Sequence, residues 1–92
     1  RRAWWRGQGL TLSPREWALL HQLALAQGQT MHIAELRARV WHQHHDPGTN
    51  SVAVHILRLR RELTRFGAGR LIETVRGQGY RLVLMNADGG AG

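Results

Sequence analysis

Apolar residues recur among polar ones at helical spacing in three segments of the chain. The first segment follows Ser13-Pro14-Arg15-Glu16. Ser13 can accept a hydrogen bond from the backbone N–H of Glu16, and Pro14 suits the first helical position. The residues expected on the inner face are Trp17, Leu20, Leu23 and Ala24. The pattern predicts a helix that begins at Pro14 and that Gly28 ends in a left-handed conformation.

The second such segment runs from Ile33 to Trp41, and the third runs from Val52 to Phe66. In the second helix the residues expected to face inward are Ile33, Leu36, Val40 and Trp41. Ser51 is the expected cap of the third helix, and Gly67 and Gly69 are expected to end it. The buried stripe predicted for this longest helix consists of Val52, Ile56, Leu59 and Leu63.

A short hairpin is expected before the helices, with strands over residues 2–6 and 10–12 and Gly7-Gln8-Gly9 as the turn. A two-stranded hairpin on its own is marginally stable in water. We therefore expect it to be the remnant of a larger N-terminal antiparallel sheet, and the chain to be a C-terminal fragment of a longer protein.

A second hairpin is expected after the helices, over residues 71–75 and 80–84. Its turn is Arg76-Gly77-Gln78-Gly79, whose two glycines permit the positive φ that a tight turn demands. The order of hairpin, three helices and hairpin predicts an α+β fold. We expect one domain over residues 1–85 and a disordered tail over residues 86–92, which are rich in Gly and Ala.

Length and composition narrow the function. A chain of 92 residues has room for one small domain. Cys is absent, which excludes disulfides, thiolate metal sites and Cys nucleophiles. No apolar run is long enough to cross a bilayer. All 13 basic residues are Arg, against 6 acidic residues, so the net charge is +7. This balance indicates a polyanionic partner.

The position of the charge indicates duplex DNA. Residues 51–81 contain seven Arg and only two acidic residues, Glu62 and Glu73. With the predicted stripe facing inward, the residues on the opposite side of the third helix are Val54, Leu57, Arg58, Arg61 and Arg65. This face presents Arg without acidic partners. A helix fits the DNA major groove, where Arg can bond guanine and Leu57 can lie against a thymine methyl group.

The second hairpin adds to this interpretation. Arg76 lies at the tip of a narrow two-stranded ribbon whose glycines keep the turn thin. A guanidinium on such an arm can enter the minor groove, where the negative potential is strongest over A·T-rich sequence. Taken alone, Arg76 is better explained as an ordinary exposed hairpin residue.

Three stretches resemble one known family. Residues 10–20, LTLSPREWALL, resemble the opening of the winged-helix effector domain of OmpR/PhoB-type response regulators. Residues 52–63, VAVHILRLRREL, resemble the recognition helix of that family. Residues 72–82, IETVRGQGYRL, match its wing. The resemblance extends from about Trp5 to Val83, and it implies a winged helix-turn-helix with a C-terminal hairpin wing and an N-terminal antiparallel sheet, here incomplete.

The resemblance also implies a function and its partners. Members of the family are cytoplasmic transcription regulators of two-component systems, and they bind promoter DNA as head-to-tail dimers on tandem direct repeats. The upstream part of such a protein is usually a phosphorylatable receiver domain and less often a membrane-anchored sensor. The loop after the second helix can contact RNA polymerase. Here the residues of that loop are His42, Gln43, His44, His45 and Asp46.

Residue roles follow from the matched positions. Arg58 matches a base-reading position, and we expect base contacts from Val54, Leu57, Arg58 and Arg61. Arg76 matches the minor-groove residue of the wing. The residues expected to contact DNA phosphates are Trp41, Asn50, Ser51, His55, Arg60, Arg65, Thr74 and Tyr80. Two of these have an alternative role, because Arg60 can instead pair internally with an acidic side chain and Tyr80 can instead belong to the core.

Three positions depart from the family pattern. Ala53 stands where Asp is usual, and Asn50 and Leu57 stand where some members carry Arg. All three lie off the predicted buried stripe, so the fold is not affected. We expect these departures to change the sequence preference and to reduce the number of ionic contacts with DNA.

Other interpretations of the sequence are weaker. The cluster of His42, His44, His45 and Asp46 lacks a second group of ligands, so no zinc or nickel site is expected. No catalytic motif is present, and we expect neither an enzyme nor a cofactor. A winged-helix module for protein contacts predicts an acidic or neutral third helix. RNA binding predicts exposed aromatic residues, for which only Trp4 and Trp5 qualify, on opposite faces of a strand.

Overall fold

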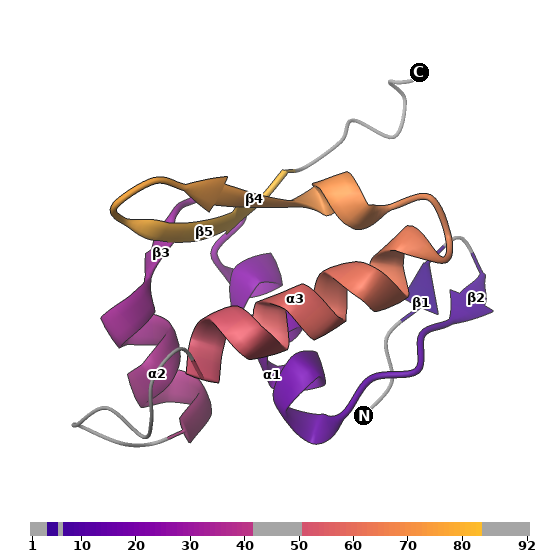
Figure 1. Cartoon of the computed structure of the whole chain (residues 1–92), viewed down its shortest axis with the longest axis horizontal. Helices are drawn as coiled ribbons and strands as arrows, with labels where there is room; N and C mark the ends of the chain where they lie inside the picture. The colour runs from indigo at the N-terminus through magenta and orange to yellow at the C-terminus, as the bar shows by residue number, and fades with distance from the viewer. Residues whose placement is uncertain (1–3, 6, 42–50, 84–92) are drawn as a thin grey trace.

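The computed structural model describes residues 4–5, 7–41 and 51–83. Three helices pack beneath a small antiparallel sheet (Figure 1). The helices are α1 (Pro14–Leu25), α2 (Ile33–Trp41) and α3 (Ser51–Thr64), with a short 3₁₀ turn at Gly69–Leu71. The strands are β1 (Trp4–Trp5), β2 (Gln8–Gly9), β3 (Met31–His32), β4 (Ile72–Val75) and β5 (Gly79–Leu82). Within the described residues no helix has the length and apolar character needed to span a bilayer.

Helix α1 begins as its sequence predicts. The Glu16 N–H donates to Ser13 Oγ at 3.1 Å, and the Ser13 N–H donates to Glu16 Oε1 at 3.1 Å. Its end differs from the prediction. Ala26 is the C-cap residue. Gln27 follows it with a positive φ of 51°, and Gly28 comes next with φ 88°. The glycine therefore takes the second left-handed position instead of the first.

The buried face of α1 is also rotated from the predicted one. Leu19 and Leu23 are fully buried, whereas Leu20 is half-buried and Ala24 is exposed. The reason is that α1 packs against α2 and β5 as well as against α3, so its core-facing side is broad. The sequence pattern of Leu19-Leu20 leaves open which of the two neighbours points to the centre.

Helix α2 has the predicted bounds, but Ile33 at its start is exposed, so the prediction that it faces inward is wrong. Helix α3 buries all four residues of its predicted stripe. It begins at Ser51, so the residue expected as a cap is instead the first helical residue. Its regular part ends at Thr64, two residues before the predicted end. The Ala68 N–H then donates to Leu63 O and the Gly67 N–H donates to Thr64 O, each at 2.9 Å, with Gly67 at φ 75°.

The sheet behind the helices has three strands in the order β3-β5-β4, all antiparallel. The sequence analysis missed β3, which pairs Met31 with Tyr80 and His32 with Gly79. Only Gly77 of the two wing glycines has a positive φ, of 72°. Gly79 is required for a different reason, because a Cβ atom on it would lie 2.0 Å from Met31 O.

The N-terminal hairpin pairs Trp4 with Gly9 and Trp5 with Gln8. Gln8 and Gly9 are thus strand residues and not the turn that was predicted, and residues 10–12 form no strand. Trp4 is exposed. The expected polymerase-contact loop, Asn50 and the expected tail over 86–92 lie outside the described residues.

Candidate nucleic-acid interface

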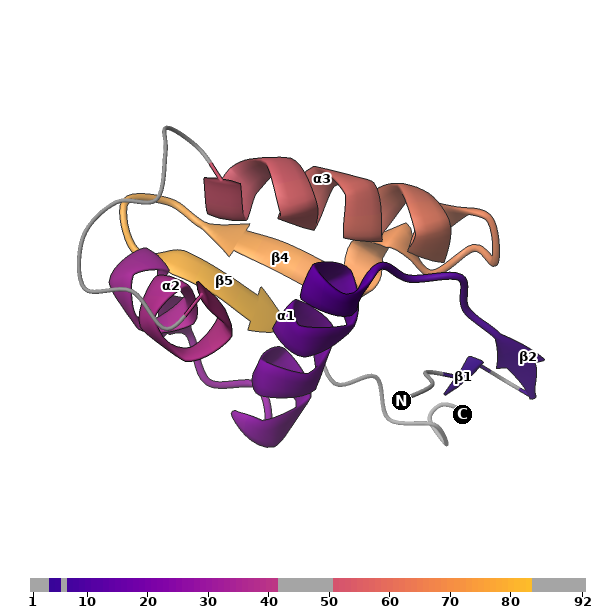
Figure 2. The ribbon, with the colours of Figure 1, turned by 90° about the horizontal axis from the view of Figure 1, so that it is seen from below.

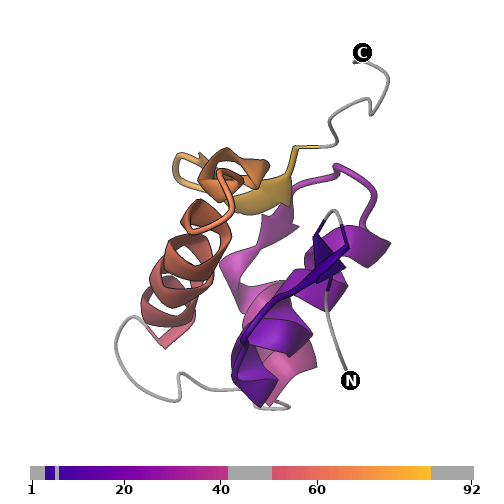
Figure 3. The ribbon, with the colours of Figure 1, turned by 90° about the vertical axis from the view of Figure 1, so that its right-hand side faces the viewer.

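One face of α3 is open to solvent, as its helical register predicts. Val54 is 39% exposed and Leu57 is 49% exposed, and Arg58 and Arg61 are exposed beside them. Figure 3 shows α3 along one side of the molecule, with α1 and α2 on its inner side. Among the described residues, Arg58 and Arg61 have no acidic partner. These four residues, expected as base contacts, form an apolar and cationic strip.

Arg65 differs from the other Arg residues on this face. Its Nη1 donates to Glu62 Oε1 at 2.9 Å, and its guanidinium lies over the Phe66 ring at 5.6 Å. The prediction that this face presents only Arg without acidic partners is therefore wrong for Arg65. Residues i and i+3 are neighbours on a helix surface, so this pairing was accessible from the sequence.

Glu62 is a buried carboxylate that the sequence analysis did not single out. Its Oε2 accepts the backbone N–H of Thr11 at 2.6 Å, which attaches the segment before α1 to α3. The Thr11 hydrogen bond holds the pKa of Glu62 below its ordinary value of 4.5, against the opposing effect of burial, and Arg65 lowers it further. The partner of Glu62 is 51 residues away along the chain, which explains why local patterns did not reveal it.

Arg60 connects α3 to the wing. Its Nε and Nη2 donate to Ile72 O at 3.1 and 2.9 Å, and Nη2 also donates to Thr74 Oγ1 at 2.7 Å. The internal alternative expected for Arg60 was an acidic partner, and the acceptors found are a carbonyl and a hydroxyl group. Thr74 is exposed, and its hydroxyl keeps its own proton to donate elsewhere.

Tyr80 belongs to the core. It is buried on β5, and the Arg60 guanidinium lies 5.8 Å from the centre of its ring. Of the two roles that the sequence left open, this position fits the core role. The Tyr80 ring therefore lies next to the Arg60 guanidinium, whose N–H groups donate to Ile72 O and Thr74 Oγ1.

The wing is the β4–β5 hairpin, with Arg76, Gly77 and Gln78 exposed at its tip. The Gln78 N–H donates to Val75 O at 2.9 Å and closes the turn. Within the described part of the chain Arg76 has no hydrogen-bond or ion-pair partner. Figures 1 and 2 both show this tip at the same end of the molecule as the start of α3.

The other Arg of the wing has a structural role. Arg81 Nε donates to Gly28 O at 3.1 Å, and its Nη1 pairs with Glu73 on the neighbouring strand. Through these two contacts the guanidinium of Arg81 joins β5 to the loop after α1 and to β4. Arg81 was not among the predicted site residues.

An aromatic cluster lies where the three helices meet. The Trp41 ring contacts the His55 ring edge-on, with centroids 5.2 Å apart, and the Arg15 guanidinium lies 4.8 Å from the centre of the Trp41 ring. His55 Nδ1 lies 2.8 Å from Ser51 O and must be the donor, because a carbonyl only accepts. Nε2 is then the ring nitrogen left to meet a ligand. Trp41, Ser51 and His55 were predicted site residues, whereas Arg15 was expected only as part of the start of the first helix.

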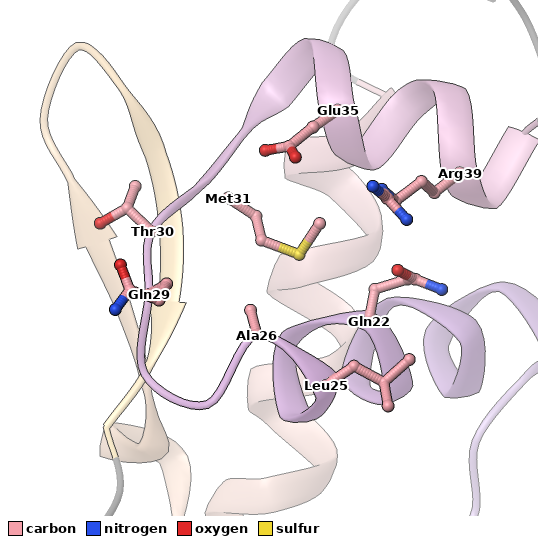
Figure 4. A pocket seen from close by; sticks show the side chains of 8 residues that line it. All are labelled: Gln22, Leu25, Ala26, Gln29, Thr30, Met31, Glu35 and Arg39. Atoms are coloured by element: carbon pink, nitrogen blue, oxygen red, sulfur yellow. The ribbon is translucent and has the colours of Figure 1, made fainter.

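A separate hollow of about 290 Å³ lies between α1, β3 and α2 (Figure 4). Met31 and Leu25 provide its apolar surface, and Glu35 and Arg39 lie at its edge. The one carboxylate in this lining, Glu35, already accepts the His32 N–H at 3.3 Å. Neither α3 nor the wing contributes to it. Among the described residues, no group of three His, Cys, Asp or Glu could hold a metal ion.

The sequence has clear relatives. Residues 7–82 match the family model described as "Transcriptional regulatory protein, C terminal". The transcriptional regulatory protein BasR of Escherichia coli is 41% identical over 83 residues, which cover 90% of this chain and 36% of BasR. CutR of Streptomyces coelicolor is 37% identical over 76 residues, which cover 83% of this chain and 34% of CutR. The chain thus spans about a third of the length of these curated relatives. They are described as regulators and not as enzymes, in agreement with the sequence analysis.

Solved structures are similar over most of the chain. The DNA-binding domain of CpxR from E. coli has a TM-score of 0.76 and 34% identity, covering 89% of this chain and 81% of that one. The RstA DNA-binding domain of Klebsiella pneumoniae, in complex with the RstA box, has a TM-score of 0.78 and 31% identity, covering 90% and 83%. These similarities confirm the predicted fold class, with three helices and a C-terminal hairpin.

Proposed function

This chain belongs to the family of C-terminal domains of transcriptional regulatory proteins, and from that premise we propose that it binds promoter DNA with the exposed face of α3 and the tip of the wing. The membership confirms the resemblance that its three motifs predicted. Its role in transcription regulation follows from the family, whereas the assignment of grooves and residues is the proposal developed here.

The observation that carries the proposal is that six Arg residues, located on α3, directly after it and on the wing, divide into two groups. Arg60, Arg65 and Arg81 are bonded within the protein. Among the described residues, Arg58 and Arg61 on α3 and Arg76 on the wing have no such partner. A guanidinium left without internal acceptors retains all its donors for guanine edges or phosphate oxygens.

The shape of each element supports a particular groove. A helix with an outer diameter of about 10–12 Å fits the major groove, which is about 12 Å wide. Arg58 and Arg61 then reach base edges, and Val54 and Leu57 contact thymine methyl groups. The thin wing tip suits the narrower minor groove, into which Arg76 projects.

The phosphate contacts we propose come from residues that flank this strip. Trp41, Ser51 and His55 lie around the start of α3, and Thr74 offers its hydroxyl on the wing. Arg65 is 65% exposed and can bind a phosphate while it pairs with Glu62. Asn50 remains proposed from the sequence alone. For Arg60 and Tyr80 we now favour positioning roles, because their polar or aromatic groups are engaged inside the protein.

The wider assembly is also proposed. The relatives are about three times as long as this chain, which supports its placement as the effector part of a response regulator with a receiver domain upstream. We propose head-to-tail dimers on tandem direct repeats, and contact between the His42–Asp46 loop and RNA polymerase. Promoter DNA as the partner implies a cytoplasmic location.

Selection of preferred sites from random duplex DNA tests the proposal. The expected result is one enriched half-site, repeated in the same orientation at a fixed spacing. Arg58→Ala should change the preference at one position of that half-site. Failure to enrich any duplex sequence, or equal affinity for single-stranded RNA, would contradict sequence-specific DNA binding.

A further inference from the structure

Arg15 occupies a position where it does not help its own helix. It is the second residue of α1, and a cation in the first turn of a helix is opposed by the positive end of the helix dipole. The capping box of α1 uses Ser13 and Glu16 and does not involve Arg15. Among the described residues no carboxylate lies within ion-pair distance of it. Within the part of the chain that the structure describes, its charge is therefore paired with no carboxylate, and its guanidinium contacts the Trp41 ring.

The contacts of Arg15 lead to the start of α3. Its guanidinium lies 4.8 Å from the centre of the Trp41 ring. The Trp41 ring in turn contacts the ring of His55 edge-on, and His55 belongs to the first turns of α3. His55 is fixed in turn by its bond to Ser51 O. Residues from all three helices thus form one cluster, and two of them, Trp41 and His55, are proposed phosphate contacts.

The surroundings of Arg15 are electropositive. Arg15, His21 and Arg39 line one hollow of about 380 Å³ along α1 and α2, and its lining contains no acidic residue. An anion that approaches Arg15 therefore meets no carboxylate competitor from this surface. Each additional cation nearby also raises the local concentration of a polyanion.

We propose that Arg15 is a DNA-phosphate contact, which extends the interface from α2 and α3 to the start of α1. This inference rests on the proposed function. A guanidinium stacked on an aromatic ring keeps its N–H donors free in its own plane, where two of them can meet the oxygens of one phosphate. Because Trp41 already orders the side chain, little conformational entropy is lost on binding.

The test compares three variants of the full chain on a short duplex of random sequence. Arg15→Ala removes the charge and the stack, and Arg15→Lys keeps the charge alone. Arg70→Ala is the control, because it removes one exposed positive charge from the 3₁₀ turn that follows the end of α3. Affinity is measured between about 50 and 200 mM salt, where the slope of log affinity against log salt counts phosphate contacts.

We expect Arg15→Ala to weaken binding about tenfold and to make the salt slope shallower by about one unit. Arg15→Lys should restore the slope and part of the affinity, and Arg70→Ala should change neither. The thermal stability of Arg15→Ala should stay close to that of the native chain, since the lost contact with Trp41 and the relief of an unfavourable charge at the helix start are both small and opposite in sign.

Two failures can be told apart. If the native chain shows no salt-dependent affinity for duplex DNA, the proposed function itself fails. If the native chain binds but Arg15→Ala keeps the native slope, Arg15 acts only by supporting Trp41, and the inference is overturned. Equal slopes for Arg15→Ala and Arg70→Ala would overturn it as well, because the effect would then be one of net charge.

Discussion

Replacing Glu62 by Gln tests the contact that holds the N-terminal segment against α3. In the native protein Glu62 Oε2 accepts the Thr11 N–H at 2.6 Å, and Oε1 pairs with Arg65 at 2.9 Å. Gln has nearly the same shape and can still present a carbonyl oxygen to Thr11. The substitution therefore removes the negative charge while keeping an acceptor in place.

The expected loss can be estimated from these two contacts. A hydrogen bond to a charged acceptor contributes about 1.5–3 kcal/mol and one between neutral groups about 0.5–1.5 kcal/mol, so the Thr11 bond loses about 1–1.5 kcal/mol. The Arg65 side chain is 65% exposed, so its ion pair adds no more than about 0.5 kcal/mol. The buried carboxylate loses some hydration in the native state, which offsets part of this sum. We expect Glu62→Gln to lower the free energy of unfolding by about 1–2 kcal/mol at neutral pH.

Urea unfolding at several pH values measures the effect. The pKa of Glu62 is lowered in the folded chain, so its carboxylate stabilises the fold above the ordinary value of 4.5. That contribution is lost as the pH falls through the folded-state pKa. The native chain and Glu62→Gln should therefore differ at neutral pH and converge in acid.

Glu73→Gln is the matched control, because Glu73 is half exposed and pairs with Arg81 at the surface. It should cost less than about 1 kcal/mol. If the two variants are equally stable at neutral pH, the Thr11 contact does not contribute in the way described. A difference between Glu62→Gln and the native chain that persists unchanged in acid would refute the role of the charge.

Three further predictions concern α3 and the wing. Arg58→Ala should cost about 1–3 kcal/mol at a selected site and less on random duplex, by fluorescence anisotropy; equal losses on both would contradict base reading. Arg76→Ala should lose most affinity where the segment beneath the wing is A·T-rich, and indifference to that segment would argue against minor-groove insertion. Gly79→Ala should destabilise the fold by about 3 kcal/mol, because its Cβ would lie 2.0 Å from Met31 O. Gly77→Ala should cost only about 1–2 kcal/mol, because Gly77 has open space around it and a positive φ of 72°. If thermal unfolding shows Gly77→Ala to be less stable than Gly79→Ala, the close approach of β3 to β5 is not the reason that position 79 requires glycine.

Local patterns predicted the features that depend on near neighbours. The α3 stripe was predicted because Val52, Ile56, Leu59 and Leu63 repeat at steps of four, three and four along one helical face, and the Ser13–Glu16 box was predicted because both partners lie in one turn. The inner face of α1 was less determined. Adjacent Leu19 and Leu20 satisfy the same spacing, and only packing against two other elements selects between them.

Features that depend on distant partners were missed. Strand β3 has two residues, too few for any periodicity, and it exists because Met31 and His32 meet β5 almost 50 residues later. The Glu62–Thr11 bond also joins distant segments. Arg60 donates to the backbone carbonyl of Ile72. Every residue has a backbone carbonyl, so the sequence does not show which one accepts the bond. Arg15 could have been noticed, because a cation in the first turn of a helix is electrostatically unfavourable.

The three hydrogen bonds from Arg60 to β4 have a geometric consequence for target choice. They join the wing to the second half of α3, so the two parts proposed to contact DNA are held in a fixed relative position. One extra base pair between the regions they touch would displace one region by about 3.4 Å and rotate it by about 34°. A rigid domain cannot compensate for such a change. If Arg58 and Arg76 contact DNA as proposed, we expect the number of nucleotides between their positions within a half-site to be fixed, whatever spacing separates one half-site from the next.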